Sequence, residues 1–213
     1  MKFQEFENKI VKITKLKLPG EVAQFKMAPM ERLVALKKIA IEKETVRKAG
    51  VLVLFYPSEA KQTMLALILR KTYKGVHSAQ IGFPGGKYEN EDTSLKETAL
   101  RETEEEIGVL RNTVSVLKKL TEVYIPPSNF FVQPYLGITK NTPNFILQEE
   151  EVETLIEVPL IHFMDDTIKI HQNLTTSYAK NIKVPAFLLN NYLVWGATAM
   201  MLNEVREMLK ELL

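Results

Sequence analysis

The sequence contains no cysteine among its 213 residues. This absence excludes disulfide bridges, a thiolate nucleophile, a cysteine–histidine catalytic pair and zinc sites built on cysteine ligands. A chain that needs no disulfide is compatible with a reducing compartment, so we expect a cytoplasmic protein.

Long apolar runs and a strong charge of one sign are absent as well. Residues 1–9 contain no apolar signal core, and the longest apolar runs are the length of a β-strand, so we expect no membrane association. The 28 Lys and Arg residues nearly balance 26 Asp and Glu residues, giving a net charge of +2. Bulk charge therefore does not favour binding to nucleic acid.

Hydrophobic periodicity predicts a helical extension before the main domain. Apolar residues at helical spacing predict helices over 3–14 and 28–47, and residues 17–20 break the first of them. We expect residues 1–50 to form this extension and to pack on a main domain formed by residues 51–213.

The main domain alternates strand patterns with two helices. The order β-β-β-α-β-β-β-α predicts a mixed β-sheet covered by helices, an α/β or α+β sandwich. A hairpin is predicted at Asn190-Asn191, because asparagine tolerates positive φ. The expected strands are 51–56, 63–69, 80–83, 114–123, 130–138 and 152–158, and the expected helices are 93–107 and 197–212.

A row of carboxylates late in the first of these helices is the densest chemical pattern. Glu102, Glu105 and Glu106 lie at i, i+3 and i+4, a spacing that places them on one helical face. Carboxylates packed together repel one another unless a cation is present. Oxygen ligands suit Mg²⁺ or Mn²⁺ rather than zinc, so the pattern predicts a site for a hard divalent cation.

Two glycines before the helix strengthen this interpretation. Gly85 and Gly86 let the backbone approach a ligand closely and expose carbonyl oxygens. Arg101 can be oriented by Asp92 or by neighbouring glutamates of the helix. A solvated, salt-bridged helix face is the alternative, but the double glycine, the carboxylate spacing and the stop at Gly108 favour a site.

The stretch resembles the sequence box of the Nudix hydrolases. That box is Gly, five residues, Glu, seven residues, Arg-Glu, an apolar residue, any residue, Glu-Glu, any residue, Gly and an apolar residue. Here Asp92 replaces the first Glu, eight residues separate it from Arg101, and Thr103 takes the apolar position. The one-residue expansion resembles the coenzyme A pyrophosphatases. The residues that fill the box are Gly86, Asp92, Arg101, Glu102, Glu105, Glu106, Gly108 and Val109.

Residues upstream of the box also resemble that subset. Gly75 stands where the subset carries a second Arg, so Lys71 or Lys74 would take its place at the substrate's phosphates. The residues in register are Leu67, Arg70, His77, Gln80, Phe83, Pro84, Gly85 and Gly86. The resemblance covers roughly residues 50–200.

The resemblance implies a Nudix-type α/β/α sandwich that hydrolyses a nucleoside diphosphate linked to another group. Bridging metals would neutralise charge at the attacked phosphorus and orient a water molecule. Arg101 would orient a glutamate, and Glu151 would be the general base, with Glu105 as the alternative. The implied ligands of Mg²⁺ or Mn²⁺ are Glu102, Glu105, Glu106 and the carbonyl of Gly86.

Coenzyme A or an acyl-coenzyme A is the implied substrate, with 3′,5′-ADP and 4′-phosphopantetheine as products. Two alternatives remain. The substrate could be ADP-ribose, a dinucleotide or a nucleoside triphosphate, or the chain could be a non-catalytic nucleotide-binding module, although the intact glutamates argue against the latter. The apolar stripes of the first and last helices suggest a homodimer, unless both are core. The implied substrate-binding residues are Arg70, Lys71, Lys74, Phe83 and Gly85.

Overall fold

The computed structural model describes residues 1–38, 46–71, 80–175 and 180–213. Its centre is an eight-stranded mixed sheet with the order β3-β2-β1-β7-β5, while β4 pairs with β1, β6 with β7 and β8 with β2. The strands are β1 (Arg47–Pro57), β2 (Thr63–Arg70), β3 (Ile81–Gly82), β4 (Gly85–Lys87), β5 (Val114–Lys119), β6 (Val123–Ile125), β7 (Phe130–Thr139) and β8 (Val152–Pro159). β1 and β7 are parallel, which makes the sheet mixed.

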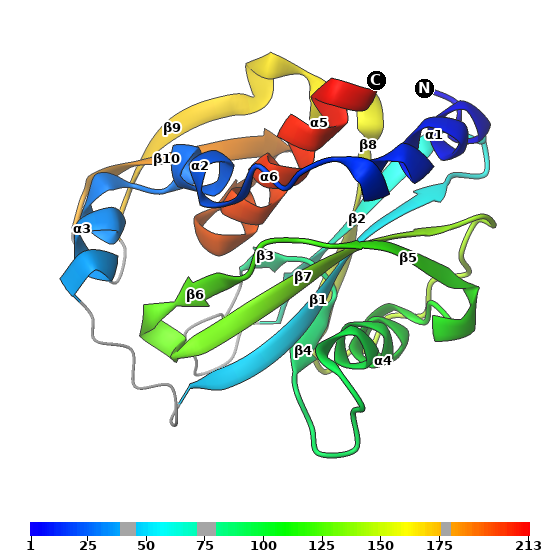
Figure 1. Ribbon diagram of the computed structural model, residues 1–213, viewed down its shortest axis with the longest axis horizontal. Helices are drawn as coiled ribbons and strands as arrows, with labels where there is room; N and C mark the ends of the chain where they lie inside the picture. The colour runs from blue at the N-terminus through cyan, green and yellow to red at the C-terminus, as the bar shows by residue number, and fades with distance from the viewer. Residues whose placement is uncertain (39–45, 72–79, 176–179) are drawn as a thin grey trace.

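Alternate residues of β1 face opposite helical layers, as the two-residue period of a strand requires. Leu52 and Leu54 belong to the cluster packed under α4 (Leu95–Ile107). Val53 and Phe55 belong to the cluster that contains α1 (Phe3–Ile10) and α6 (Gly196–Leu212). Figure 1 shows α4 on one side of the sheet and α1 and α6 on the other. The predicted α/β/α sandwich is therefore confirmed.

A second, smaller sheet follows in the C-terminal part of the chain. It has the order β11-β10-β9, formed by β9 (Lys169–Leu174), β10 (Ile182–Leu189) and β11 (Tyr192–Trp195). Asn190 and Asn191 connect β10 and β11 with φ of 48° and 67°, which confirms the predicted hairpin. β9 carries no strand signal in the sequence, because His171, Gln172 and Asn173 at its centre are polar and exposed.

Two predicted elements have different bounds in the structure. The strand expected over 114–123 is divided into β5 and β6. At the start of the break the carbonyl of Leu120 accepts a hydrogen bond from Gln133 Nε2 at 2.7 Å. The helix expected over 28–47 is α3 (Met30–Lys38), with 39–45 outside the described residues. Position 47 is already strand, since Arg47 pairs with Phe130 of β7.

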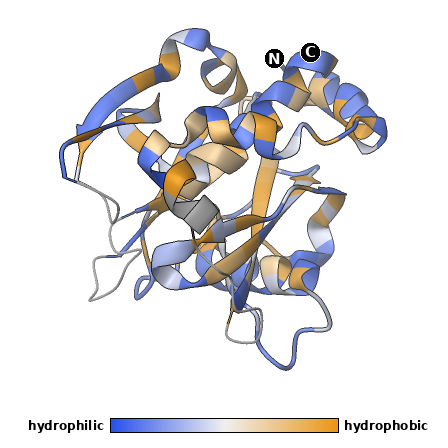
Figure 2. Ribbon diagram, turned by 60° about the vertical axis from the view of Figure 1, so that its left-hand side comes forward, coloured by the Kyte–Doolittle hydropathy of each residue, from blue (hydrophilic) through white to orange (hydrophobic). Residues whose placement is uncertain are grey.

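The N-terminal helices are part of the core. Phe3, Phe6 and Ile10 of α1 are buried, as are most apolar residues of α6. Figure 2 shows hydrophobic stretches along central strands and in the helices that pack on them. The apolar stripes that suggested a homodimer are therefore largely buried in the core of this chain. None of the helices in the described part of the chain has the length and apolar character needed to cross a membrane.

Buried and partly buried hydrogen bonds attach α2 (Gly20–Gln24) to the main domain. Gln24 Nε2 donates to Glu204 Oε2 and to the carbonyl of Thr121, both at 3.0 Å. The Glu204 carboxylate also accepts from the backbone N–H and the hydroxyl of Thr121 at 3.2 and 2.5 Å. Asn203 Nδ2 donates to the carbonyl of Ala23 at 2.7 Å. These bonds satisfy polar groups that would be costly to bury alone.

Gly50→Ala should destabilise the protein by about 3 kcal/mol, because overpacking a close contact is costly. A Cβ at Gly50 would lie 2.1 Å from the carbonyl oxygen of Leu95 and 3.0 Å from the amide nitrogen of Ala99, so α4 would have to move away from β1. Urea denaturation measures the difference. Gly82→Ala is the control, since its Cβ would meet no atom nearer than 3.9 Å. Equal stability of the two variants would contradict this tight packing.

Candidate active site

Capping at both ends fixes the position of α4. The Ser94 hydroxyl accepts a hydrogen bond from the amide of Glu97 at 3.3 Å. Gly108 ends the helix with φ of 74°, and its N–H donates to the carbonyl of Glu104 at 2.9 Å. Thr103, at the usually apolar box position, is buried and donates its hydroxyl proton to the carbonyl of Ala99. The helix therefore accommodates this departure from the box.

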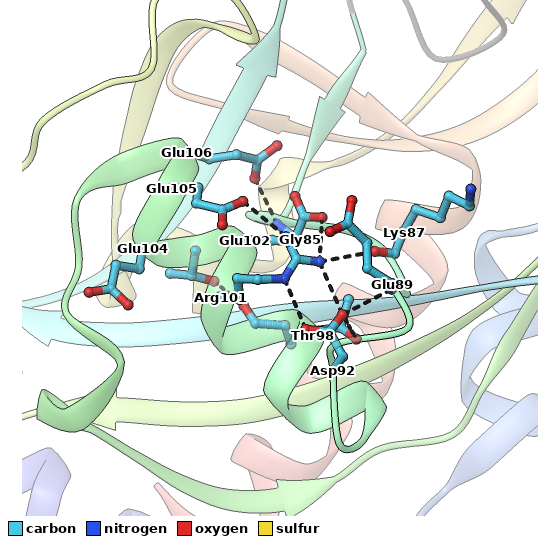
Figure 3. Close-up of polar contacts among 12 residues, drawn as sticks. Gly85, Lys87, Glu89, Asp92, Thr98, Arg101, Glu102, Glu104, Glu105 and Glu106 are labelled. Atoms are coloured by element: carbon cyan, nitrogen blue, oxygen red, sulfur yellow. Dashed lines mark hydrogen bonds and ion pairs between the residues drawn. The ribbon is translucent and has the colours of Figure 1, made fainter.

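Arg101 connects the carboxylates of α4 to the preceding loop (Figure 3). Its guanidinium donates to both oxygens of Asp92, at 2.9 and 3.1 Å. It also donates to Glu105 Oε2 at 2.9 Å, Glu102 Oε1 at 3.1 Å and the carbonyl of Lys87 at 3.2 Å. A planar fork of donors can hold several acceptors at once. Arg101 thus orients Glu102 and Glu105 and fixes the loop to the helix.

Asp92 takes the box position usually held by glutamate and still reaches the arginine. Its carboxylate accepts further hydrogen bonds from the Thr98 hydroxyl at 2.8 Å and the amide of Glu89 at 3.0 Å. The hydrogen bond from Arg101, above all, lowers the pKa of Asp92 to about 2. The shorter side chain and the one-residue longer loop therefore preserve the ion pair.

The two glycines of β4 bring the backbone against two glutamates. Gly85 has φ of 141°, and its N–H donates to Glu106 Oε2 at 2.7 Å. A Cβ at Gly86 would lie 2.4 Å from the Glu102 carboxylate. A side chain at Gly86 would therefore displace that carboxylate, and glycine is required for this close approach.

Three carboxylates converge beside this turn. Oxygen atoms of Glu102, Glu106 and Glu151 lie within 4.8 Å of one another, and among the described residues they form a group able to hold a metal ion. Burial raises the pKa of Glu106 to about 7 and also raises the pKa of Glu102. Both shifts reflect the cost of burying carboxylate charge, which a nearby cation would offset.

A hard divalent cation fits this group. Oε1 of Glu106 lies 3.0 Å from Arg70 Nη2, but the contact lacks hydrogen-bond geometry, so Oε1 is buried without a hydrogen-bond partner. The atoms of the cluster that could bind a metal ion are all carboxylate oxygens, the ligand type that Mg²⁺ and Mn²⁺ prefer. The backbone of Gly86 also lies close to the Glu102 carboxylate.

Glu105 lies apart from the three converging carboxylates. Its side chain is 54% exposed and is paired with Arg101. An α-helix turns by roughly 100° per residue. Viewed down the helix axis, Glu106 is therefore rotated by about 40° from Glu102 in one direction, and Glu105 by about 60° in the other. The side of Glu106 faces the glycine turn, and there the loop before β8 supplies Glu151 as the third carboxylate. Helical spacing alone does not distinguish these two sides.

The predicted phosphate-binding residues lie at different places. Arg70 donates to the carbonyl oxygen of Gly85 and pairs with Glu106, so it supports the carboxylate cluster. Lys71 pairs with Glu153 at 3.5 Å at the surface, and Lys74 lies outside the described residues. Phe83 is buried, 2% exposed, and borders the cavity next to the turn.

A cavity of about 540 Å³ extends from the glycine turn. Gly85, Gly86 and Arg70 line it near the carboxylates, and the C-terminal hairpin and α6 contribute Trp195 and Thr198. Arg32 of α3, which is not among the predicted site residues, also lines this cavity. No local motif marks Arg32, because the residues around it read as an ordinary amphipathic helix. The remaining apolar lining includes Ala49, Val51, Ile81, Phe83, Ile125, Pro127, Phe130, Val132, Leu193, Ala197 and Met201.

Comparisons with known sequences agree with this geometry. A family model described as NUDIX domain matches residues 46–169. The uncharacterized Nudix hydrolase NudL of Yersinia enterocolitica is 33% identical over 147 residues, which are 67% of this chain and 72% of that protein. The peroxisomal coenzyme A diphosphatase ndx-8 of Caenorhabditis elegans is 27% identical over 139 residues, 65% of this chain and 59% of ndx-8.

Solved structures show a similar fold. The Nudix hydrolase RenU of M. smegmatis superposes with a TM-score of 0.53 at 14% identity, covering 78% of this chain and 87% of RenU. A MutT/nudix family protein from Enterococcus faecalis gives a TM-score of 0.50 at 18% identity, covering 97% of this chain and 73% of that one. At this identity the likeness concerns the fold alone.

Asp92→Asn should lower the free energy of unfolding by about 2 kcal/mol at pH 7, because the ion pair that depresses the pKa of Asp92 is lost. A lowered pKa stabilises the fold above the ordinary value of 3.8, and this contribution disappears as the pH falls towards 2. Urea denaturation from pH 7 down to pH 3 tests both statements.

The control is Glu91→Gln, because Glu91 is the exposed neighbour of Asp92. We expect its stability to stay within about 0.5 kcal/mol of the wild type. If the difference in the free energy of unfolding between Asp92→Asn and the wild type were the same at pH 3 as at pH 7, the ion pair would not be the cause of that difference.

Proposed function

Because the chain belongs to the Nudix family, we propose that it hydrolyses the diphosphate bond of coenzyme A or an acyl-coenzyme A. The products are 3′,5′-ADP and 4′-phosphopantetheine or its acyl form. The observation that carries this proposal is the convergence of Glu102, Glu106 and Glu151 beside a glycine turn that lines the cavity.

In this proposal Glu102, Glu106 and the carbonyl of Gly86 hold Mg²⁺ or Mn²⁺. When bound, the divalent cation neutralises charge on the diphosphate and lowers the pKa of a coordinated water. Arg101 holds Glu102 in place through a bond of 3.1 Å. Arg70 does the same for Glu106, since it contacts both Glu106 and the glycine turn.

Glu151 is our proposed general base. It comes from the loop before β8 and is exposed, so water can reach its carboxylate beside the other two. A general base must lie within hydrogen-bond reach of the water that it deprotonates. Glu105 is the weaker candidate for both base and ligand, because Arg101 holds its carboxylate on the outer side of α4.

The charge and size of the cavity support a large polyanionic substrate. Its charged lining residues, within the described ranges, are the cations Arg32, Arg70 and Lys87. A volume of about 540 Å³ lies within the range usual for nucleotide-sized ligands. The name of the C. elegans relative, a coenzyme A diphosphatase, supports coenzyme A as the first substrate to test.

Incubation with Mg²⁺ and a substrate panel, with products identified by mass, tests the substrate. The panel is coenzyme A, acetyl-coenzyme A, ADP-ribose, NADH and the dNTPs. We expect coenzyme A or acetyl-coenzyme A to be cleaved with the highest kcat/KM. Cleavage of ADP-ribose without cleavage of either would overturn the substrate, and no hydrolysis of any compound would overturn the enzymatic function.

Glu106→Gln should lower kcat/KM by about 100-fold and weaken Mn²⁺ binding, because a buried carboxylate ligand is lost. A Mn²⁺ titration followed by electron paramagnetic resonance measures binding without turnover. Glu104→Gln is the matched control, since Glu104 pairs with Arg111 and lies outside the carboxylate cluster. A Glu106→Gln enzyme with normal Mn²⁺ affinity would remove Glu106 from the site.

Glu151→Gln should reduce kcat by about 10²- to 10⁴-fold while Mn²⁺ affinity changes little, as expected when a general base is removed. Glu150→Gln, at the neighbouring exposed position, should turn over normally. A large loss of Mn²⁺ affinity in Glu151→Gln would instead make Glu151 a metal ligand. The pH dependence of kcat in wild type and variant separates the two roles further.

A further inference from the structure

Arg70 lies at the boundary between the carboxylate cluster and the cavity. Its Nη2 donates a hydrogen bond to the carbonyl oxygen of Gly85 and lies 3.0 Å from Oε1 of Glu106. Arg70 also lines the cavity together with Gly85 and Gly86. One guanidinium therefore reaches both the carboxylate that the proposed function assigns to the cation and the cavity that it assigns to the substrate.

The contact between Arg70 and Glu106 is incomplete. Oε2 of Glu106 accepts a hydrogen bond from the Gly85 N–H at 2.7 Å, but Oε1 is buried and has no hydrogen-bond partner among the described residues, in spite of the nearby guanidinium. A buried acceptor without a hydrogen bond is costly. A divalent cation carries twice the charge of the guanidinium and requires no donor angle, so it would satisfy Oε1 better than Arg70 does.

A cation at Glu106 and the guanidinium of Arg70 would repel each other in these positions. Oε1 and Nη2 are 3.0 Å apart. With metal–oxygen distances of about 2 Å, a cation bound by Oε1 would lie within roughly 5 Å of Nη2. Like charges this close repel strongly in a partly buried site, where screening is weaker than in water. Each of the two therefore weakens the binding of the other to Glu106.

The side chain of Arg70 can move while its backbone stays in place. The backbone pairs with Val152 of β8, and its N–H donates to the carbonyl of Gln80 at 3.1 Å. The side chain is 24% exposed, compared with 2% for Glu106, and borders the cavity. Within the part of the chain that the structure describes, no Asp or Glu lines this cavity. An anion that meets Arg70 there is therefore one that a ligand brings.

We propose that Arg70 leaves Glu106 when a divalent cation binds there and turns into the cavity, where it binds a phosphate of the substrate. The inference rests on the proposed function for both the cation and the phosphate-bearing substrate. Arg70 neutralises Glu106 before the cation binds and the substrate afterwards. A guanidinium suits the second task, because it binds phosphate through paired, charge-assisted hydrogen bonds.

A Mn²⁺ titration followed by electron paramagnetic resonance, with no nucleotide present, tests the competition. Arg70→Gln should bind Mn²⁺ about fivefold more tightly than the wild type, because a like charge beside the ligand is removed. The sign of the change is decisive. If Arg70 only holds Glu106 in position for the metal, the same substitution weakens Mn²⁺ binding instead.

Titration calorimetry with 3′,5′-ADP tests the movement into the cavity. This ligand carries phosphates but no diphosphate bond, so it is not hydrolysed. At saturating Mn²⁺ the wild type should bind it about tenfold more tightly than Arg70→Gln, as expected for a charge-assisted phosphate contact. Without Mn²⁺ the two proteins should agree within about twofold, because Arg70 then stays at Glu106. Any contact between Mn²⁺ and the phosphate is common to both proteins and cancels in this comparison.

Arg111→Gln is the matched control. It removes an arginine from an ion pair with another glutamate of α4, Glu104, at a position 47% exposed and outside the cavity lining. Its affinities for Mn²⁺ and 3′,5′-ADP should stay within about twofold of the wild type. Arg70→Lys retains the charge without the planar fork and should bind Mn²⁺ with an affinity between those of wild type and Arg70→Gln. It serves as the second variant should Arg70→Gln fail to fold, as judged by circular dichroism.

Two results would overturn the proposal. One is a Mn²⁺ affinity of the Arg70 variants equal to or below that of the wild type. The other is a ratio of 3′,5′-ADP affinities, wild type to Arg70→Gln, that is the same with and without Mn²⁺. Neither titration involves turnover. A wild-type protein that fails to cleave coenzyme A would therefore overturn the proposed function, while the titrations separately decide the role of Arg70.

Discussion

The bidentate ion pair between Arg101 and Asp92 is the contact on which the rest of the site depends. It fastens the loop after β4 to α4, and the same guanidinium holds Glu102 and Glu105. Because Arg101 is mostly buried, its partly buried hydrogen bonds to Asp92 and Glu102 count for more than they would at the surface. In this chain the loop length and the Asp at position 92 keep this pair.

The carboxylate cluster is electrostatically costly in itself. Glu106 is almost fully buried, and its pKa is raised to about 7 by desolvation, although Arg70 and the amide of Gly85 lower it. Two glycines make the close packing of this cluster possible. Gly50 lets α4 lie directly on β1, and Gly86 lets the turn approach Glu102. Perturbed carboxylate pKa values of this kind are common at functional sites.

The cavity joins parts of the chain that are distant in sequence. Arg32 comes from the N-terminal helices, the glycine turn from β4, and Trp195 from the last hairpin. Strand β1 already begins at Arg47 and pairs there with β7. The division expected at residue 50 therefore cuts a strand, and the N-terminal segment supplies both core side chains and a cavity wall.

The sequence alone determined the local features. Capping residues, the glycine pair and the i, i+4 spacing of Glu102 and Glu106 are set by neighbours in the chain, so the box and its helix could be predicted. The pairing of Glu105 with Arg101 is likewise local, at i, i+4, whereas tertiary structure decided that Glu151, from a distant loop, joins Glu102 and Glu106. Such choices depend on which face of the helix packs on the sheet and on which loop meets it, and no local pattern encodes either.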